Sequence, residues 1–175
     1  MSFTEAEEIH RSLLERWRTA MNLVGPGPIA SHFIDAVGAV EGLDAHGRWA
    51  DLGSGAGFPG IALAARHPNV SVVLVESRAK RATFLATVVR DAKLSNATVF
   101  HGRVEALESG FNGVISRAFR PPEEYLQDAA RLLVSDGQAV LLSGDTPPPF
   151  EGWEVRETRN YAVPGGTRSR TVLVR

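Results

Sequence analysis

A carboxylate and a run of glycines stand together in the first third of the sequence. Segment 49–60 reads Trp-Ala-Asp-Leu-Gly-Ser-Gly-Ala-Gly-Phe-Pro-Gly, with a short apolar stretch before it and a helical pattern after it. Glycines let the backbone turn tightly and approach a ligand without interference from a Cβ atom, and the N-terminus of the following helix presents unpaired amides. The segment therefore predicts a binding site for a small polar ligand.

Two acidic residues narrow the chemistry of that ligand. Asp51 ends the expected strand just before the first glycine, where its carboxylate would repel a pyrophosphate but suit an ammonium and a sulfonium. Glu76 ends the next expected strand, where a carboxylate can accept hydrogen bonds from both ribose hydroxyls of a nucleoside. Dinucleotide enzymes share the second feature and not the first. The pair therefore favours S-adenosylmethionine over NAD.

The choice of methyl acceptor is narrowed by what the chain lacks. It contains no cysteine, which closes the covalent thiolate route to carbon-5 of a pyrimidine. Exocyclic amines are commonly methylated by enzymes with an Asn/Asp-Pro-Pro-aromatic motif after the fourth strand, whereas segment 116–122 reads Ser-Arg-Ala-Phe-Arg-Pro-Pro. The N7 atom of guanine has a lone pair that is free at neutral pH, so it needs hydrogen-bond donors and a stacking ring and no general base.

Arg117 and Phe119 could supply these two functions. Arg117 could bond the guanine edge or a phosphate, and Phe119 could stack on a base. The alternatives are a surface salt bridge for Arg117 and ordinary core packing for Phe119. His32 and Asp35 stand three residues apart on one expected helix and could form a local pair. The remaining histidines lack metal-ligand spacing, so no metal site is expected.

The elements that position these residues follow a βαβ pattern. Thr4 and Glu7 form a potential capping box for a helix through Leu23, and a second amphipathic helix runs to about Val40 after the Gly/Pro-rich stretch 25–28. Strands are expected at 48–52, 70–76, 97–101, 112–116, 138–143, 153–160 and 169–174, and further helices at 58–66, 78–93 and 121–134. Crossovers make the first five strands parallel, whereas the short connection between the last two fits an antiparallel hairpin.

The bulk composition sets the class of protein. The 175 residues carry a formal net charge of −1, so any contact with RNA must be local. No apolar run approaches the roughly 20 residues of a membrane span, and the acidic N-terminus lacks the features of a secretory signal. We expect one α/β domain over 1–175, with an N-terminal helical segment at 1–47 and a Rossmann-like core at 48–175. We also expect a cytoplasmic monomer.

Several segments together resemble the small-subunit ribosomal RNA guanine-N7 methyltransferases, formerly called glucose-inhibited division protein B. The segments are 51–60, 77–81 with Phe84 and Leu85, 103–105, 115–119, Trp17 with 22–23, 32–35, and 163–166 with Arg168. The resemblance runs from about Leu13 to Arg175. It implies the seven-stranded class I S-adenosylmethionine-dependent methyltransferase fold, S-adenosylmethionine as cofactor, and ribosomal RNA or the small ribosomal subunit as partner.

The resemblance also implies roles for individual residues. Arg117 would stand beside the reacting centre, and Val104 and Glu105 would lie along the adenine. The cofactor site would comprise Asp51, Gly53, Ser54, Gly55, Gly57, Phe58, Glu76, Ser77, Val104, Glu105 and Arg117. The residues expected to contact RNA are Arg78, Lys80, Arg81, Phe119 and Arg168.

The chain departs from the family pattern at two positions. Ser31 and Ser143 stand where that family usually carries Arg and Lys, so two positive charges that could face RNA are absent. Two alternatives to an RNA enzyme therefore stay open. One is a methyltransferase for a small molecule or a protein, and the other is a cofactor-binding module without turnover.

Overall fold

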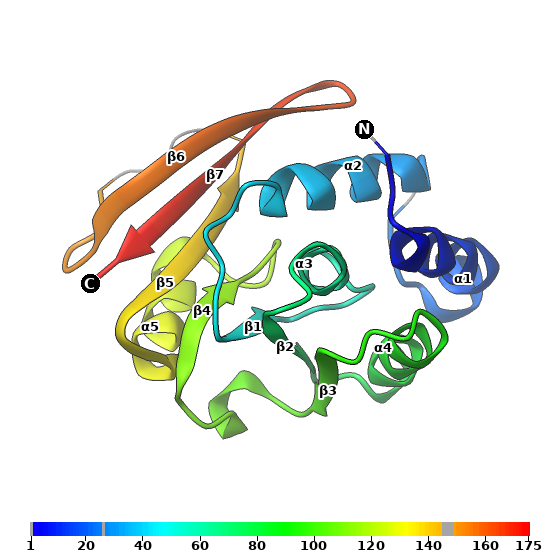
Figure 1. Ribbon diagram of the computed structural model, residues 1–175, viewed down its shortest axis with the longest axis horizontal. Coiled ribbons are helices and arrows are strands. Elements are labelled where there is room, and N and C mark those ends of the chain that lie inside the picture. The colour runs from blue at the N-terminus through cyan, green and yellow to red at the C-terminus, as the bar shows by residue number, and fades with distance from the viewer. Residues whose placement is uncertain (1, 26, 145–148) are drawn as a thin grey trace.

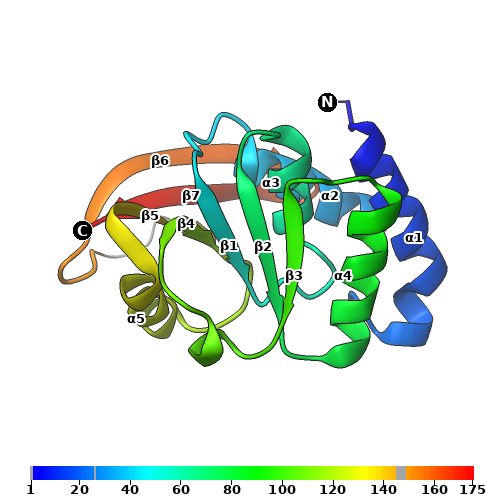
Figure 2. The same cartoon turned by 60° about the horizontal axis from the view of Figure 1, so that its bottom comes forward.

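One seven-stranded sheet organises the computed structural model, which describes residues 2–25, 27–144 and 149–175. The strand order is β3-β2-β1-β4-β5-β7-β6; the first five strands in sequence are parallel, and β7 is antiparallel to both its neighbours. Figure 2 shows β1, β2 and β3 side by side and the β6–β7 hairpin beyond β5. The strands are β1 (Arg48–Leu52), β2 (Ser71–Glu76), β3 (Ala97–His101), β4 (Phe111–Ile115), β5 (Leu133–Ser143), β6 (Glu154–Val163) and β7 (Gly166–Val174). The expected seven-stranded α/β fold is confirmed.

Helices cover both faces of the sheet (Figure 1). Four of them, α1 (Glu5–Met21), α2 (Ile29–Val40), α3 (Gly60–Arg66) and α4 (Ala79–Asp91), lie on one face, and α5 (Pro122–Leu132) with the 3-10 turn η1 (Val104–Ala106) lies on the other. Side chains of β2 alternate between the two cores, with Val72 and Leu74 in the first and Val73 and Val75 in the second. Burial on both faces explains why this strand is a continuous apolar run. Among the described residues, no helix has both the length and the apolar character needed to cross a bilayer.

The first helix begins at the expected capping box and ends slightly before the expected residue. The Glu7 amide donates to the Thr4 hydroxyl (3.2 Å), and the Thr4 amide donates to the Glu7 carboxylate (2.7 Å). The helix ends at Met21 because Asn22 takes the left-handed conformation, with φ 49°. A left-handed residue is a common helix terminator.

The connection from α5 to β5 differs from the prediction. The helix was expected through 134 and the strand from 138, but α5 ends at Leu132 and β5 begins at Leu133. Leu133 already pairs with Phe111 of β4, and the register then shifts before Gly113 pairs with Gln138. This irregularity, with Asp136 at φ 65°, accommodates the extra residues, as β-bulges do.

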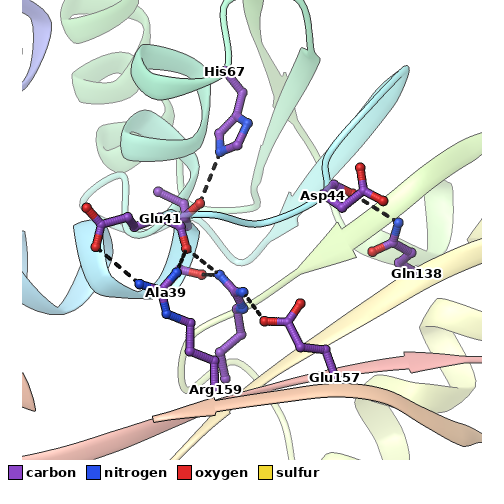
Figure 3. Close-up of polar contacts among 9 residues, drawn as sticks. Ala39, Glu41, Asp44, His67, Gln138, Glu157 and Arg159 are labelled. Carbon is purple, nitrogen blue, oxygen red and sulfur yellow. Dashed lines mark hydrogen bonds and ion pairs between the residues drawn. The ribbon is translucent and has the colours of Figure 1, made fainter. Parts of the chain in front are cut away.

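The β6–β7 hairpin is longer than expected and is fastened to the C-terminal end of α2. The pairing continues to Val163 opposite Gly166, which extends both strands toward the turn. Arg170 of β7, with none of its surface exposed, donates to the carbonyls of Ala39 (3.2 Å) and Glu41 (2.9 Å). Figure 3 shows Arg159 and Glu157 of β6 beside the same end of the helix. The last carbonyls of a helix lack partners within it, so these guanidinium groups satisfy them.

Candidate functional site

A cavity of about 370 Å³ opens at the carboxyl ends of four adjacent parallel strands, β1 to β4. The strand order reverses direction between β1 and β4, and ligands of open α/β sheets bind at such a switch point. The walls combine backbone, acidic and basic groups. The lining residues are Gly53, Val75, Glu76, Ser77, Arg78, Arg81, Gly102, Arg103, Val104, Glu105, Ala118, Phe119 and Arg120.

Two backbone amides hold the Glu76 carboxylate in the wall of this cavity. Its side chain is buried, one carboxylate oxygen accepts the amide of Gly55 at 3.0 Å, and the other accepts the amide of Arg78 at 2.8 Å. The carboxylate thereby ties the glycine turn to the start of α4. Each oxygen retains a second acceptor site, so the pair can still accept the two hydroxyls of a ribose.

Asp51 is fully buried behind the glycine turn and has one unpartnered oxygen. Its Oδ2 accepts the amide of Gly60 at 3.0 Å, and a Cβ atom at position 60 would lie 2.5 Å from that oxygen. Among the described residues Oδ1 has no hydrogen-bond partner. Burial raises the pKa of Asp51 to about 6. A buried carboxylate that is only half satisfied favours a cation nearby.

Of the glycine turn, only Gly53 is among the lining residues of the cavity, and the other residues stabilise the turn. The Ser54 hydroxyl donates to the Asp51 carbonyl at 2.9 Å, and the Gly57 amide donates to the Ser54 carbonyl at 2.7 Å. Gly53 has φ 70°, and a Cβ atom there would lie 2.4 Å from the Phe119 ring. Phe119 therefore packs directly on the turn and forms part of the cavity wall.

The predicted cofactor residues thus fall into two groups. The cavity is lined by Gly53, Glu76, Ser77, Val104 and Glu105, whereas Asp51, Ser54, Gly55, Gly57, Phe58 and Arg117 are not among its lining residues. Asp51, Ser54, Gly55 and Gly57 shape or brace the turn. Phe58 and Arg117 lie together, with the guanidinium carbon 4.7 Å from the ring centroid.

Arg117 belongs to a cluster of polar side chains around Asp35, called the Asp35 cluster below: Asp35, Arg117, Tyr161 and Arg168. Arg117 donates to one Asp35 oxygen at 3.2 Å, and the Tyr161 hydroxyl donates to the other at 2.9 Å. The Arg168 Nε atom lies 3.8 Å from that second oxygen. The local pair of His32 and Asp35 considered from the sequence is replaced by these long-range partners, and His32 stacks on Phe58 with 5.7 Å between ring centroids.

The residues expected to contact RNA do not form one group. Arg78, Arg81 and Phe119 line the cavity, Lys80 is exposed on α4, and Arg168 is exposed beside Asp35. Arg81 also donates to the Asn22 carbonyl at 3.0 Å, which links the cavity wall to the end of α1. The expected set therefore divides between the cavity and the Asp35 cluster.

The roles of two residues at the site were not predicted from the sequence. His10 of α1 is fully buried, and its Nε2 atom lies 2.7 Å from the carbonyl of Ala56 in the glycine turn. Burial lowers its pKa to about 4, so the neutral ring donates to that carbonyl. Its position four residues before the buried Leu14 is the only local signal for this role. Arg120 bonds Glu105 at 2.5 Å and lies over the Phe119 ring, a placement that no local pattern indicates.

Known proteins resemble this chain in sequence over nearly its whole length. The family model described as rRNA small subunit methyltransferase G matches residues 5–161. The protein named "Ribosomal RNA small subunit methyltransferase G" from Pseudomonas fluorescens (strain Pf0-1) is 37% identical over 93% of this chain and 81% of its own length. The protein of the same name from Azoarcus sp. (strain BH72) is 36% identical over 93% of this chain and 82% of its own.

A solved structure shows the same fold at much lower sequence similarity. Fibrillarin from Aeropyrum pernix, solved with natively bound S-adenosyl-L-methionine, aligns with a TM-score of 0.60 and 17% identity over 83% of this chain and 74% of its own. At that identity the likeness concerns the fold alone.

Proposed function

The chain belongs to the rRNA small subunit methyltransferase G family, and we propose that it transfers a methyl group from S-adenosylmethionine to N7 of one guanine in small-subunit ribosomal RNA. Family membership favours this acceptor over the small-molecule and protein acceptors that the sequence left open, and over a module without turnover. As part of the same proposal, the enzyme acts as a monomer in the cytoplasm.

The cavity at the glycine turn fits the cofactor. Glu76 would accept the ribose hydroxyls, and Val104 and Glu105 would lie along the adenine. The buried Asp51 carboxylate, with its unpartnered oxygen, would supply a negative charge near the ammonium and sulfonium groups. When bound, the cofactor supplies a methyl group on a positively charged sulfur, which an in-line nucleophile can accept.

The acceptor requires little chemical assistance, so the protein chiefly supplies orientation. Guanine N7 needs no general base, and the edge of the base also presents the O6 acceptor. Arg117, held between Asp35 and the ring of Phe58, would donate to that edge or to a phosphate. The observation that carries the proposal is this placement of Arg117 against the glycine turn, because it joins an acceptor-binding group to the cofactor site.

Base mapping tests the proposed function directly. The protein would be incubated with radiolabelled S-adenosylmethionine and small ribosomal subunits that lack guanine-N7 methylation, beside free ribosomal RNA. We expect label on one guanine, at a position that borohydride and aniline then cleave. Cofactor binding by calorimetry without label in either RNA sample would refute the proposal and favour a small-molecule or protein acceptor.

Replacing Arg117 by Ala is expected to lower kcat for the small subunit by about 100-fold, because a preorganised donor at the acceptor is lost. The Kd for S-adenosylmethionine should change little, since the proposal assigns Arg117 to the acceptor and gives it no bond to the cofactor. Steady-state kinetics and calorimetry measure the two effects separately. An equal loss of cofactor affinity would place Arg117 in cofactor binding instead.

Cofactor affinity is expected to increase as the pH rises from about 5 to about 7. Burial holds the pKa of Asp51 near 6 in the free protein, and a cation bound beside it favours the ionised form. At pH 5 the proton must first leave, so binding should be about tenfold weaker than at pH 7. Calorimetry in buffers of different ionisation enthalpy should detect proton release near pH 6. The Asp51→Asn variant should lose this pH dependence.

A further inference from the structure

Asp35 of α2 receives side chains from three other parts of the chain. Arg117 follows β4, Tyr161 belongs to β6 and Arg168 to β7, and the first two make hydrogen bonds to different oxygens of the carboxylate. We propose that Asp35 is a positioning residue for methyl transfer, acting through Arg117. The inference rests on the proposed function, since it names the group that orients the acceptor-binding arginine.

Two contacts define where the Arg117 guanidinium lies. Asp35 holds one of its nitrogens, and the ring of Phe58 lies 4.7 Å from its carbon. Across the described parts of the chain, the hydrogen bond to Asp35 is the only one that this guanidinium makes. Its other N–H groups can therefore donate hydrogen bonds to a substrate while Asp35 holds the side chain in place. Because Phe58 belongs to the glycine turn, this orientation is set relative to the cofactor site.

Tyr161 in turn fixes the carboxylate of Asp35. Its ring packs directly against Gly38, where a Cβ atom would come within 2.2 Å of the ring, and this close approach brings the hydroxyl to Asp35. Burial and the neighbouring carboxylate raise the pKa of Tyr161, so the hydroxyl stays protonated and donates. Asp35 thus holds Arg117 with one oxygen while the other is held by the hairpin.

The charges in the Asp35 cluster suit methyl transfer to guanine N7. Asp35 faces the two cations Arg117 and Arg168, and burial together with Arg117 lowers the pKa of the nearby His32. The carboxylate offsets part of the positive charge that would otherwise oppose the cationic base formed by N7 methylation. A net positive charge remains, which favours a phosphate or the acceptor edge of guanine.

A double-mutant cycle tests whether Asp35 acts through Arg117. The four proteins are wild type, Asp35→Asn, Arg117→Ala and the double variant, each assayed for kcat and KM with small ribosomal subunits, for the cofactor Kd and for Tm. We expect Asp35→Asn to lower kcat by between about 10-fold and 100-fold, the range for a displaced reacting group, with an unchanged cofactor Kd. The double variant should be no slower than Arg117→Ala alone.

A second buried ion pair provides the matched control. Glu7 of α1 is almost fully buried and binds Arg66 of α3 at 2.7 Å, so Glu7→Gln removes a comparable charge from a pair that includes neither Asp35 nor Arg117. This variant should lower Tm and leave kcat within about twofold at a temperature where it is folded. Equal losses of kcat in Glu7→Gln and Asp35→Asn would show that Asp35→Asn lowers kcat only by destabilising the fold.

The outcomes separate the two proposals. Wild-type kcat retained by Asp35→Asn, or losses that multiply in the double variant, would overturn the role of Asp35 while leaving the proposed function intact. A wild-type protein that transfers no methyl group to the small subunit would instead overturn the proposed function, and the role of Asp35 with it. Reduced kcat in Tyr161→Phe, smaller than in Asp35→Asn, would support the arrangement in which Tyr161 holds the carboxylate.

Discussion

Replacing Glu76 by Ala should weaken S-adenosylmethionine binding by on the order of 1000-fold, the largest functional effect expected from a single substitution in this chain. Two charge-assisted hydrogen bonds to the ribose would be lost, each contributing roughly 1.5–3 kcal/mol. The substitution also removes the acceptors of the Gly55 and Arg78 amides, so the turn itself loosens. Calorimetric titration of the variant with S-adenosylmethionine measures the change in Kd.

A suitable control for Glu76→Ala is a variant that removes a negative charge from a residue outside the cavity. Glu108 is exposed on the segment after η1 and is not among the lining residues, so Glu108→Gln should bind the cofactor like wild type. Circular dichroism and Tm establish that Glu76→Ala is folded under the conditions of the titration. An affinity within about tenfold of wild type would mean that Glu76 does not hold the ribose.

Replacing Arg170 by Ala should reduce the free energy of unfolding by about 4 kcal/mol, the largest effect on stability expected here. The guanidinium is completely buried and donates to the carbonyls of Ala39 and Glu41 and, at 2.5 Å, to Glu157. The truncated side chain would leave a cavity, and the Ala39 carbonyl would lose its donor. Tm should fall by roughly 10 °C for a domain of this size.

The exposed Arg156 on the same hairpin provides the control. It forms an ion pair with Asp44 at 3.4 Å, and both side chains are at least half exposed. Such pairs contribute little, so Arg156→Ala should cost less than about 1 kcal/mol. Denaturant titrations of both variants compare the two arginines directly. Similar losses in the two would show that burial of Arg170 adds nothing to the attachment of the hairpin to α2.

Much of the fold was predictable because its signals are local. Strands such as 72–75 are continuous apolar runs, and the short connection before Gly166 permits only an antiparallel return. The predicted start of β5 was wrong because Leu133 and Val134 also fit the end of the preceding helix, and the next residues, Ser135 to Gly137, carry no apolar pattern. Their strand assignment depends on the pairing of Leu133 with Phe111, which is a tertiary contact.

Part of the proposed cofactor site was also predictable from the sequence, for a geometric reason. The carboxyl ends of parallel strands meet at one edge of a sheet, so Gly53 and Glu76 were expected together once the strands were identified, whereas Val104 was expected only from the family resemblance. Glycine positions with positive φ likewise follow from the turn itself. What the residue types did not reveal is that Asp51 would brace the start of α3 rather than line the cavity.

The sequence by itself determined the sheet, the glycine turn and the chemistry of the proposed nucleoside site, because these depend on local periodicity and on residues at successive strand ends. Only the tertiary structure decided the partners of Asp35, the bond from His10 to the turn and the burial of Arg170. Each of these contacts joins residues at least 46 positions apart. Such contacts form where α1, α2 and the hairpin pack together, and the docking of separate elements leaves no trace in the pattern of any one of them.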